Sequence, residues 1–266
     1  MRGTHLFTLP NLGVPSYGDE YQAVYDSFTT KPIAATAEIW NTMVESLVSS
    51  GEWSMLDIFD VFAAHINSGS EALKNWISPG TFNPLLIGAP VFTANEGFMG
   101  TGVIDLVWNP FADGVNYIQD SGTLGAYSRT DVNENSAIVG GNDVTDGARI
   151  LPRRTGTARI TVNALTATDD RAVVADSLGM LIATRTANNV QKLYKNKVAV
   201  INGVDASSGV PNINLYALAN NNNGSQNQER NGQISLAFAG AGMTQTNINN
   251  ITNAFNTAMT ALGKNV

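Results

Sequence analysis

Apolar and polar residues alternate between positions 180 and 201, and this pattern restricts the possible fold of the chain more than any other. The stretch reads MLIATRTANNVQKLYKNKVAVI, in which short apolar runs are mixed with alternating polar residues and separated by ANN and NK. A period of two places neighbouring side chains on opposite faces of a β-strand, and Asn tolerates the positive φ of a tight turn. The stretch therefore predicts a β-meander with one dry face and one wet face.

The rest of the chain adds further strands. Apolar runs at residues 213–219 and 233–239 predict two strands around the polar loop NNNNGSQNQERNG at 220–232. Residues 76–160 hold short apolar runs broken by Gly, Pro and Asn, which is typical of the many short strands of a sandwich. With 266 residues, 43% of them apolar, the chain is long enough to bury one large core.

Three apolar patterns with spacings of three and four predict helices. The first covers residues 33–47, and the second covers residues 55–64, with His65 placed to interact with the dipole at its C-terminal end. The third begins after Thr244, a good N-cap, and ends before Gly263, which is placed as a C-cap. We expect this C-terminal helix to dock on the body through a stripe of apolar residues: Ile248, Ile251, Phe255, Ala258 and Leu262.

Charge and composition exclude several classes of partner. The chain has 15 basic and 22 acidic residues, and its net charge of −7 repels both a phosphate backbone and an anionic membrane. We therefore expect no nucleic-acid partner and no membrane partner. The absence of Cys excludes disulfides and thiolate chemistry. No apolar run is long enough for a signal peptide or a bilayer span, so we expect a soluble protein made in the cytoplasm.

Five segments, in a fixed order, carry a resemblance to a known family. They are VFTANEGFMGTG (91–102), VWNPFADGVNY (107–117), GAYSRT (125–130), GMLIATRTANNVQKLYKNKVAV (179–200) and the terminal ALGKNV. Over roughly residues 35–266 the chain resembles the concanavalin-A-like, laminin-G-like jelly-roll domain of structural proteins of tailed bacteriophages. The Gly and Asn residues of these motifs make turns, so the motifs specify fold better than activity. Lys197 departs from the pattern, because the family usually has Gly there.

The resemblance implies a mainly β fold: a concanavalin-A-like jelly-roll sandwich with N-terminal helices and a C-terminal helix packed on it. It also implies a structural protein on the exterior of a bacteriophage virion, as head decoration, head fibre or tail adhesion component. Such a protein acts by assembly with other virion proteins and with copies of itself. It is located in the virion after synthesis in the cytoplasm of the bacterial host. One alternative is a glycan-binding module that attaches to the host surface, and another is a glycan depolymerase.

The predicted organisation is an N-terminal arm, residues 1–30, followed by a body of residues 31–266 that holds the helices and the sandwich. The arm lies mostly outside the resemblance and is interpreted as an attachment segment. It carries apolar side chains for which the sandwich gives no partner, and we expect a neighbouring protein to cover them. These candidate interface residues are Leu6, Phe7, Leu9 and Leu12.

Catalysis is not expected from the acidic residues. Retaining glycosidases hold two carboxylates about 5–5.5 Å apart, which an E-x-D-x-x-E strand provides, and the sequence has no such stretch. If loops did bring acids together, Asp113, Asp120 and Asp131 would be the set. We therefore predict that the chain is not an enzyme and has no catalytic residue. The sequence has one cluster of basic residues, which either lies at a solvated strand edge or contacts the carboxylates of a partner protein. Its members are Arg149, Arg153, Arg154 and Arg159.

Two sets of residues are candidates for ligand and metal binding. Trp108, followed by Asn-Pro at a strand end, is placed to stack on a sugar, and the loop residues Asn220, Asn221, Asn222 and Asn223 are candidate ligand contacts, although an ordinary strand connection is favoured. The D-x-N-x-N spacing of Asp131, Asn133 and Asn135 offers oxygen ligands to calcium. The glycine and distal Glu of a full calcium loop are missing, so a polar turn is favoured and no cofactor is expected.

Overall fold

The meander of residues 180–201 forms in the computed structural model, which describes residues 16–165 and 169–266. Its strands pair in antiparallel register: β11 (Gly179–Ala187), β12 (Val190–Lys195) and β13 (Val198–Gly203). They form one edge of an eight-stranded sheet, sheet A, of order β13-β12-β11-β6-β17-β4-β3, in which β1 also pairs with β17. The other strands of sheet A are β1 (Leu56–Val61), β3 (Val91–Thr93), β4 (Gly97–Met99), β6 (Gly122–Ser128) and β17 (Gln233–Gly240).

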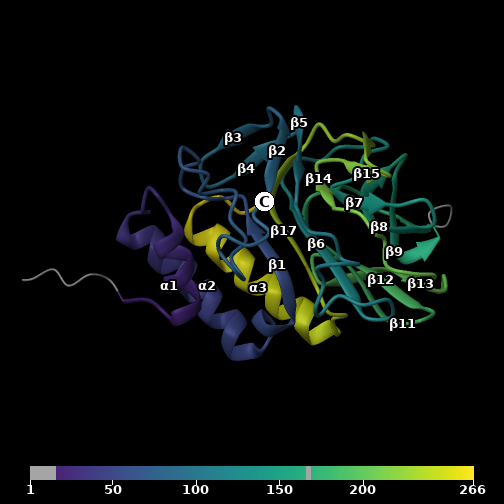
Figure 1. Ribbon diagram of the computed structural model, residues 1–266, viewed down its shortest axis with the longest axis horizontal. Coiled ribbons are helices and arrows are strands. Elements are labelled where there is room, and N and C mark those ends of the chain that lie inside the picture. The colour runs from purple at the N-terminus through teal and green to yellow at the C-terminus, as the bar shows by residue number, and fades with distance from the viewer. Residues whose placement is uncertain (1–15, 166–168) are drawn as a thin grey trace, which may run out of the picture.

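A second, nine-stranded sheet, sheet B, packs against sheet A (Figure 1). Its order is β10-β9-β8-β7-β14-β5-β2, and the β15–β16 hairpin joins it through a parallel pair with β7. Its strands are β2 (Leu85–Gly88), β5 (Gly102–Asp105), β7 (Val139–Asn142), β8 (Asp146–Arg154), β9 (Thr157–Leu165), β10 (Asp170–Val173), β14 (Tyr216–Ala217), β15 (Asn220–Asn222) and β16 (Ser225–Asn227). The predicted mainly β sandwich is confirmed.

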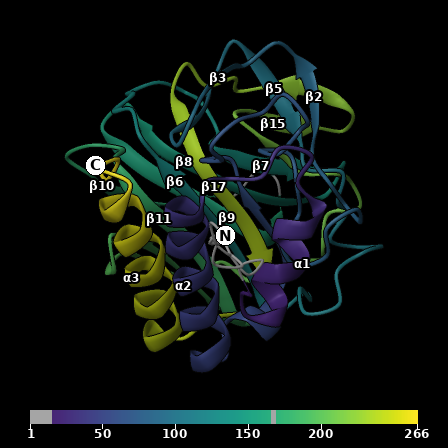
Figure 2. The same ribbon diagram turned by 90° about the vertical axis from the view of Figure 1, so that its left-hand side faces the viewer.

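Three helices lie side by side over the outer face of sheet A (Figure 2): α1 (Asp19–Ser27), α2 (Ala34–Ser50) and α3 (Gln245–Ala261). The predicted caps of α3 are confirmed, because the Thr244 side chain accepts a hydrogen bond from the Asn247 amide and Gly263 follows the helix with φ 68°. The described part of the chain contains no helix with the length and hydropathy needed to cross a bilayer.

Two separate cores hold the three layers together. Between the sheets, Leu181 and Ala183 of β11 pack with Ile150 and Ile160 of sheet B. On its other face, β11 buries Met180 and Ile182 against the helices, with Trp40 of α2 and Phe255 of α3 in the same cluster. The prediction of one dry and one wet face is therefore wrong for the central strands of sheet A, because the helix layer covers the face that was expected to meet solvent.

The prediction of a second helix, at residues 55–64, is also wrong. A short 3-10 helix, η1 (Trp53–Met55), leads into strand β1, which buries Ile58 between the sheets and Phe59 under the helices. A strand buried on both faces reads as a continuous apolar run, which periodicity does not distinguish from a buried helix. His65 consequently has no helix end beside it. Its Nε2 lies 2.8 Å from the Thr30 carbonyl oxygen, and burial lowers its pKa.

The body begins earlier than the predicted boundary at residue 31. Tyr21, Val24 and Phe28 are buried in the helix-layer core, so α1 belongs to the body. Their spacing of three and four residues is the helical pattern that defines a packed face. Residues 1–15 lie outside the described part of the chain, and the four candidate interface residues, Leu6, Phe7, Leu9 and Leu12, lie among them.

The turn between β12 and β13 keeps the two-residue form that the sequence predicted, although Lys occupies its second position. Asn196 and Lys197 have φ of 48° and 75°, so both adopt the left-handed conformation of a type I′ turn. A side chain there costs about 1–2 kcal/mol relative to Gly. We expect Lys197→Gly to raise the free energy of urea unfolding by about 1 kcal/mol, because relief of strain exceeds the added chain entropy.

The hairpin β15–β16 provides the matched control for that turn. Its turn residues Asn223 and Gly224 have φ of 50° and 90°, and no atom lies within 4 Å of a Cβ built on Gly224. Gly224→Ala should therefore lower the free energy of unfolding by about 1 kcal/mol through backbone strain alone. If Lys197→Gly destabilises the protein by as much as Gly224→Ala does, backbone strain at Lys197 is refuted.

Candidate functional site

A polar pocket of about 290 Å³ opens at the rim of the sandwich, where the edge of sheet B meets the loop that follows β16. One wall comes from the end of β2 and from the turn between β4 and β5, and the other comes from the predicted loop 220–232. Its lining residues are Ile87, Gly88, Gly100, Thr101, Gly102, Gln226, Glu229, Arg230 and Asn231. The pocket thus joins segments more than 120 residues apart in sequence.

The glycine-rich wall is shaped by a close approach of two backbones. A Cβ on Gly100 would lie 1.8 Å from the Arg230 carbonyl oxygen, so no other residue fits there without moving the chain. The Gly100 amide donates a 3.0 Å hydrogen bond to the Gly232 carbonyl oxygen. The motif GFMGTG therefore fixes the distance between the two walls of the pocket.

Two side chains with hydrogen-bonding groups, Gln226 and Glu229, stand at the opposite wall. Gln226 Nε2 donates a 2.8 Å hydrogen bond to Glu229 Oε1, and both side chains are exposed. A Gln amide has two donor hydrogens and an acceptor oxygen, and an ionised Glu has two acceptor oxygens, so one mutual bond leaves capacity for a ligand. Across the pocket Ile87 adds an apolar surface. The arrangement suits a polyhydroxylated ligand with an apolar face.

Arg230 anchors this loop to sheet A and does not present its charge to the pocket. Its guanidinium donates to Ser128 Oγ and the Thr130 carbonyl oxygen at 3.0 Å each and to Ser177 Oγ at 3.1 Å. The residue is 1% exposed, and burial lowers its pKa to about 10, against the opposing effect of nearby acids. The backbone of the loop is fixed again where Glu134 Oε1 accepts from the Asn231 amide at 2.9 Å.

The structure divides the predicted ligand contacts. Asn220 and Asn221 are buried within β15, whereas Asn222 and Asn223 are exposed at the hairpin. The loop was predicted to lie between strands without structure of its own, but its first half forms the β15–β16 hairpin. Gln226 of β16 and the residues that follow the hairpin line the pocket, so the four Asn residues lie beside the pocket and not in it.

The prediction that the Trp108 ring is placed to stack on a sugar is wrong. Its side chain is 0% exposed in the core between the sheets, with its ring centroid 5.6 Å from that of Tyr117 in an edge-on contact. A fully buried ring has no face to stack on a sugar. The strand before it, β5, already ends at Asp105, and the Asn-Pro that follows Trp108 opens a turn in which the Asp113 amide donates to the Asn109 carbonyl oxygen.

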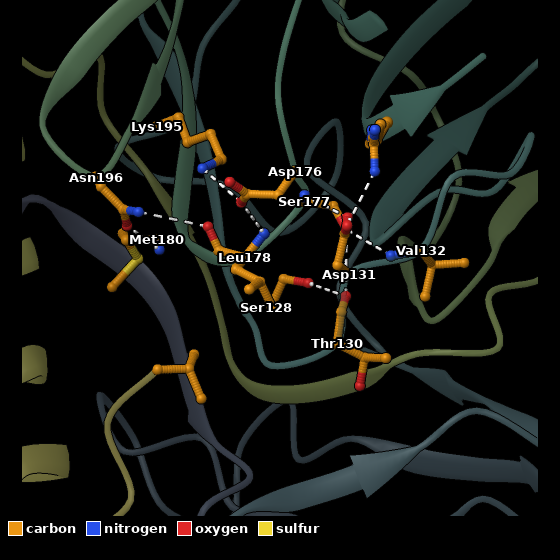
Figure 3. A network of polar contacts seen from close by, with 12 residues as sticks. Ser128, Thr130, Asp131, Val132, Asp176, Ser177, Leu178, Met180, Lys195 and Asn196 are labelled. Atoms are coloured by element: carbon orange, nitrogen blue, oxygen red, sulfur yellow. Dashed lines mark hydrogen bonds and ion pairs between the residues drawn. The ribbon is translucent and has the colours of Figure 1, made fainter. Parts of the chain in front are cut away.

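The oxygens of the predicted calcium loop each face a different protein donor. Asp131 Oδ1 accepts from the Ser177 amide at 2.9 Å and Ser177 Oγ at 3.1 Å (Figure 3), and Arg153 Nη1 lies 2.9 Å from Asp131 Oδ2. Burial opposes the charge of Asp131, yet these contacts hold its pKa below the ordinary value. Asn133 Oδ1 accepts from Gly156 N, and Asn135 Oδ1 accepts from Gln228 Nε2. An ion here would have to displace these donors, and the calcium site stays a prediction.

Asp120 and Asp131, two of the three acids proposed as a catalytic set, do not form a pair of the required kind. Asp120 precedes β6 and Asp131 follows it, so a strand of seven residues lies between them. At about 3.4 Å per residue that is on the order of 24 Å, far beyond the separation of paired glycosidase carboxylates. Asp113 accepts from the Asn109 amide at 2.9 Å and closes a local turn.

Two of the four arginines in the basic group, Arg153 and Arg159, form ion pairs within the chain. Arg159 Nη1 lies 3.2 Å from Asp169 Oδ2, and Arg171 Nη2 lies 3.1 Å from the other oxygen of the same carboxylate. With Arg153 held by Asp131, the group supplies contacts between strands and loops of sheet B. The sequence left open a partner's carboxylates or a strand edge; the four arginines lie on β8 and β9, which are inner strands of sheet B and not its edge.

The pocket residues outside the Asn run were not found from the sequence. Gln226, Glu229 and Asn231 lie in the loop 220–232, but its run of Asn drew attention to the wrong half. The spacing of Gly97, Gly100 and Gly102 in GFMGTG was the available signal, since closely spaced glycines mark a close backbone approach.

No protein-family model matches the chain, and no curated protein matches its sequence. Among solved structures, a mutant sialidase of Trypanosoma rangeli that displays trans-sialidase activity is similar, with a TM-score of 0.53 and 12% identity over 84% of this chain and 39% of that chain. The binding domain of botulinum neurotoxin serotype D has a TM-score of 0.50 and 9% identity over 75% of this chain and 52% of that chain.

A third similar structure is domain 4 of a GH43 extracellular arabinanase from Geobacillus stearothermophilus, solved in complex with arabinotriose. Its TM-score is 0.49, with 15% identity over 74% of this chain and 98% of that chain. At these identities the similarities concern the fold alone, and a concanavalin-like sandwich fits them. This chain spans less than half of the sialidase chain and about half of the neurotoxin chain.

Proposed function

We propose that this chain is a glycan-binding β-sandwich module that acts by attachment and not by catalysis. The observation that carries the proposal is the rim pocket, in which the hydrogen-bonding side chains of Gln226 and Glu229 stand opposite the apolar side chain of Ile87. Its volume of about 290 Å³ is at the lower end of the range for ligand sites, which suits one unit of a polysaccharide chain. The occurrence of this fold in a sialidase and in a neurotoxin binding domain supports the same class.

Attachment is favoured over hydrolysis by the number and place of the acids. Hydrolysis of a glycosidic bond needs one carboxylic acid to protonate the leaving oxygen and a second carboxylate to attack or activate water. Among the described residues that line the pocket, Glu229 is the only acid. A single carboxylate that accepts hydrogen bonds from sugar hydroxyls fits recognition.

Binding should depend on the side chains of Gln226 and Glu229. A hydrogen bond to the neutral Gln226 contributes about 0.5–1.5 kcal/mol and one to the charged Glu229 about 1.5–3 kcal/mol, so Gln226→Ala with Glu229→Ala should weaken binding about tenfold or more. An array of bacterial surface glycans identifies the ligand, and titration calorimetry then measures both proteins. Gln119→Ala, an exposed Gln outside the pocket, should bind like the parent. Equal affinity of the double variant and the parent would refute this pocket as the site.

The setting that we propose for this module is the exterior of a bacteriophage particle, as head decoration, head fibre or tail adhesion component. This part rests on the ordered motifs between residues 91 and 200 and on the apolar segment that precedes the body. A density map of the intact particle is expected to place the sandwich on the outer surface, with the rim pocket turned outward. A location inside the shell would contradict the proposal.

A further inference from the structure

A second hollow lies on the helix layer, far from the rim pocket in the fold. It is a groove of about 290 Å³ between α2 and α3, the two neighbouring helices in Figure 2. Met43, Ala254 and Ala258 are buried and form its floor, and Thr42, Ser46 and Thr257 stand exposed at its rim. The groove exists because both helices present small side chains along the line where they meet.

The lining of this groove is uncharged and mostly apolar. Its nine residues are Ile39, Thr42, Met43, Ser46, Asn253, Ala254, Thr257, Ala258 and Ala261. Burial of apolar side chains in such a hollow removes both surfaces from water, and no lining charge has to be desolvated. The acids of α2 stand away from the groove: a Cβ on Gly18 would lie 3.2 Å from Glu45 Oε1, which places Glu45 on the α1 side of the helix.

The printed sequence contains a segment with matching chemistry. Residues 1–15, the leading segment, read MRGTHLFTLPNLGVP, with four large apolar residues between positions 6 and 12, one Arg and no acid. Apolar side chains suit the groove, and a segment without acids brings no carboxylate that would have to be desolvated there. Fifteen residues reach at most about 50 Å, which is enough to cross to another molecule.

The point where the leading segment joins the body favours another molecule over its own groove. The Gly18 amide donates a 2.9 Å hydrogen bond to Asn41 Oδ1, and the Tyr17 ring lies 5.3 Å from that of Tyr21 on α1. The chain therefore enters on the α1 side of α2, whereas the groove is on the α3 side. To fill its own groove the segment would have to turn back across α2.

We propose that the groove between α2 and α3 receives residues 6–12 of the leading segment of a second copy of this chain. The contact is an interface for self-assembly and does not depend on glycan binding at the rim pocket. Mutual exchange of two leading segments would close a symmetric dimer, while one-way exchange would build a chain of molecules.

Light scattering of the full-length protein after size exclusion is the first test, at concentrations from 1 to 100 µM or so. The parent should form a dimer or larger species, and deletion of residues 1–15 should give a monomer. The double variant Ser46→Glu with Thr257→Glu, which places charge at the exposed rim, should also be monomeric. Ser49→Glu with Thr246→Glu, on exposed positions of the same helices outside the groove, should assemble like the parent.

Complementation separates this proposal from a general loss of stability. The deletion variant keeps its groove, and the groove variant keeps its leading segment, so their mixture should form a heterodimer that neither forms alone. A labelled peptide of residues 1–15 should bind the deletion variant in fluorescence anisotropy, at least tenfold more tightly than the deletion variant with Ser46→Glu and Thr257→Glu. A monomeric parent at all concentrations, or assembly unchanged by either variant, would overturn the proposal.

Discussion

Phe255→Ala is expected to lower the free energy of unfolding by about 3–5 kcal/mol, the range for removal of a fully buried aromatic side chain. Phe255 is 0% exposed, and its ring centroid lies 5.0 Å from that of Tyr127 and 6.3 Å from that of Trp40. The residue therefore joins α3, sheet A and α2 at one point, and its loss leaves a cavity between the helix layer and sheet A. Urea unfolding followed by circular dichroism measures the effect.

Thr260→Ala is the matched control, because Thr260 is exposed on the same helix. Its effect should stay within about 0.5 kcal/mol, as is usual for surface substitutions. A loss below about 0.5 kcal/mol for Phe255→Ala as well would mean that α3 is not packed on the sheet.

Asp60→Asn is expected to stabilise the protein at pH 7 by an amount on the order of 3 kcal/mol, the scale of an uncompensated buried charge. Asp60 lies in β1 with 0% exposure, and among the described residues neither of its carboxylate oxygens has a hydrogen-bond partner. Burial raises its pKa well above the ordinary value. Keeping this carboxyl in the fold at pH 7 costs free energy, because it must be protonated or held charged without a partner.

The dependence on pH has a definite sign. Because the folded pKa of Asp60 is raised, its contribution to stability is fully present below the unfolded pKa near 3.8 and is lost as pH rises through the folded pKa. The advantage of Asp60→Asn over the parent should thus grow from pH 4 upward in urea unfolding. Glu45→Gln, an exposed acid on α2, should show no such trend. A constant difference between Asp60→Asn and the parent across pH 4–8 would contradict the assignment.

The parts of the fold that could be read from sequence are those with one buried face or a definite cap. α3 has both, with Thr244 and Gly263 at its ends and one apolar stripe, and it forms where it was predicted. β1 has neither, because both of its faces are buried and its residues lose the period of two. The prediction of a wet face on sheet A failed for a related reason: alternation says which residues share a face, but it does not say what will cover that face.

The candidate site was harder to predict than the fold, since it depends on contacts between distant segments. Ile87 and Gln226 meet at the rim only because β2 and the β15–β16 hairpin both belong to sheet B. Trp108 illustrates the opposite error: its neighbours in sequence suggested exposure at a strand end, and its neighbours in space bury it completely. The local sequence predicts where the chain turns, but it does not predict whether a side chain next to the turn points into the core or into solvent.

Attachment without catalysis is tested most directly by incubating the full-length chain with bacterial capsular polysaccharide and following bound protein and new reducing ends in the same samples. We predict saturable binding that Gln226→Ala with Glu229→Ala weakens about tenfold or more. We also predict no rise in reducing ends over the protein-free control. Sustained release of reducing ends that disappears with Asp120→Asn or Asp131→Asn would contradict it and would identify a depolymerase.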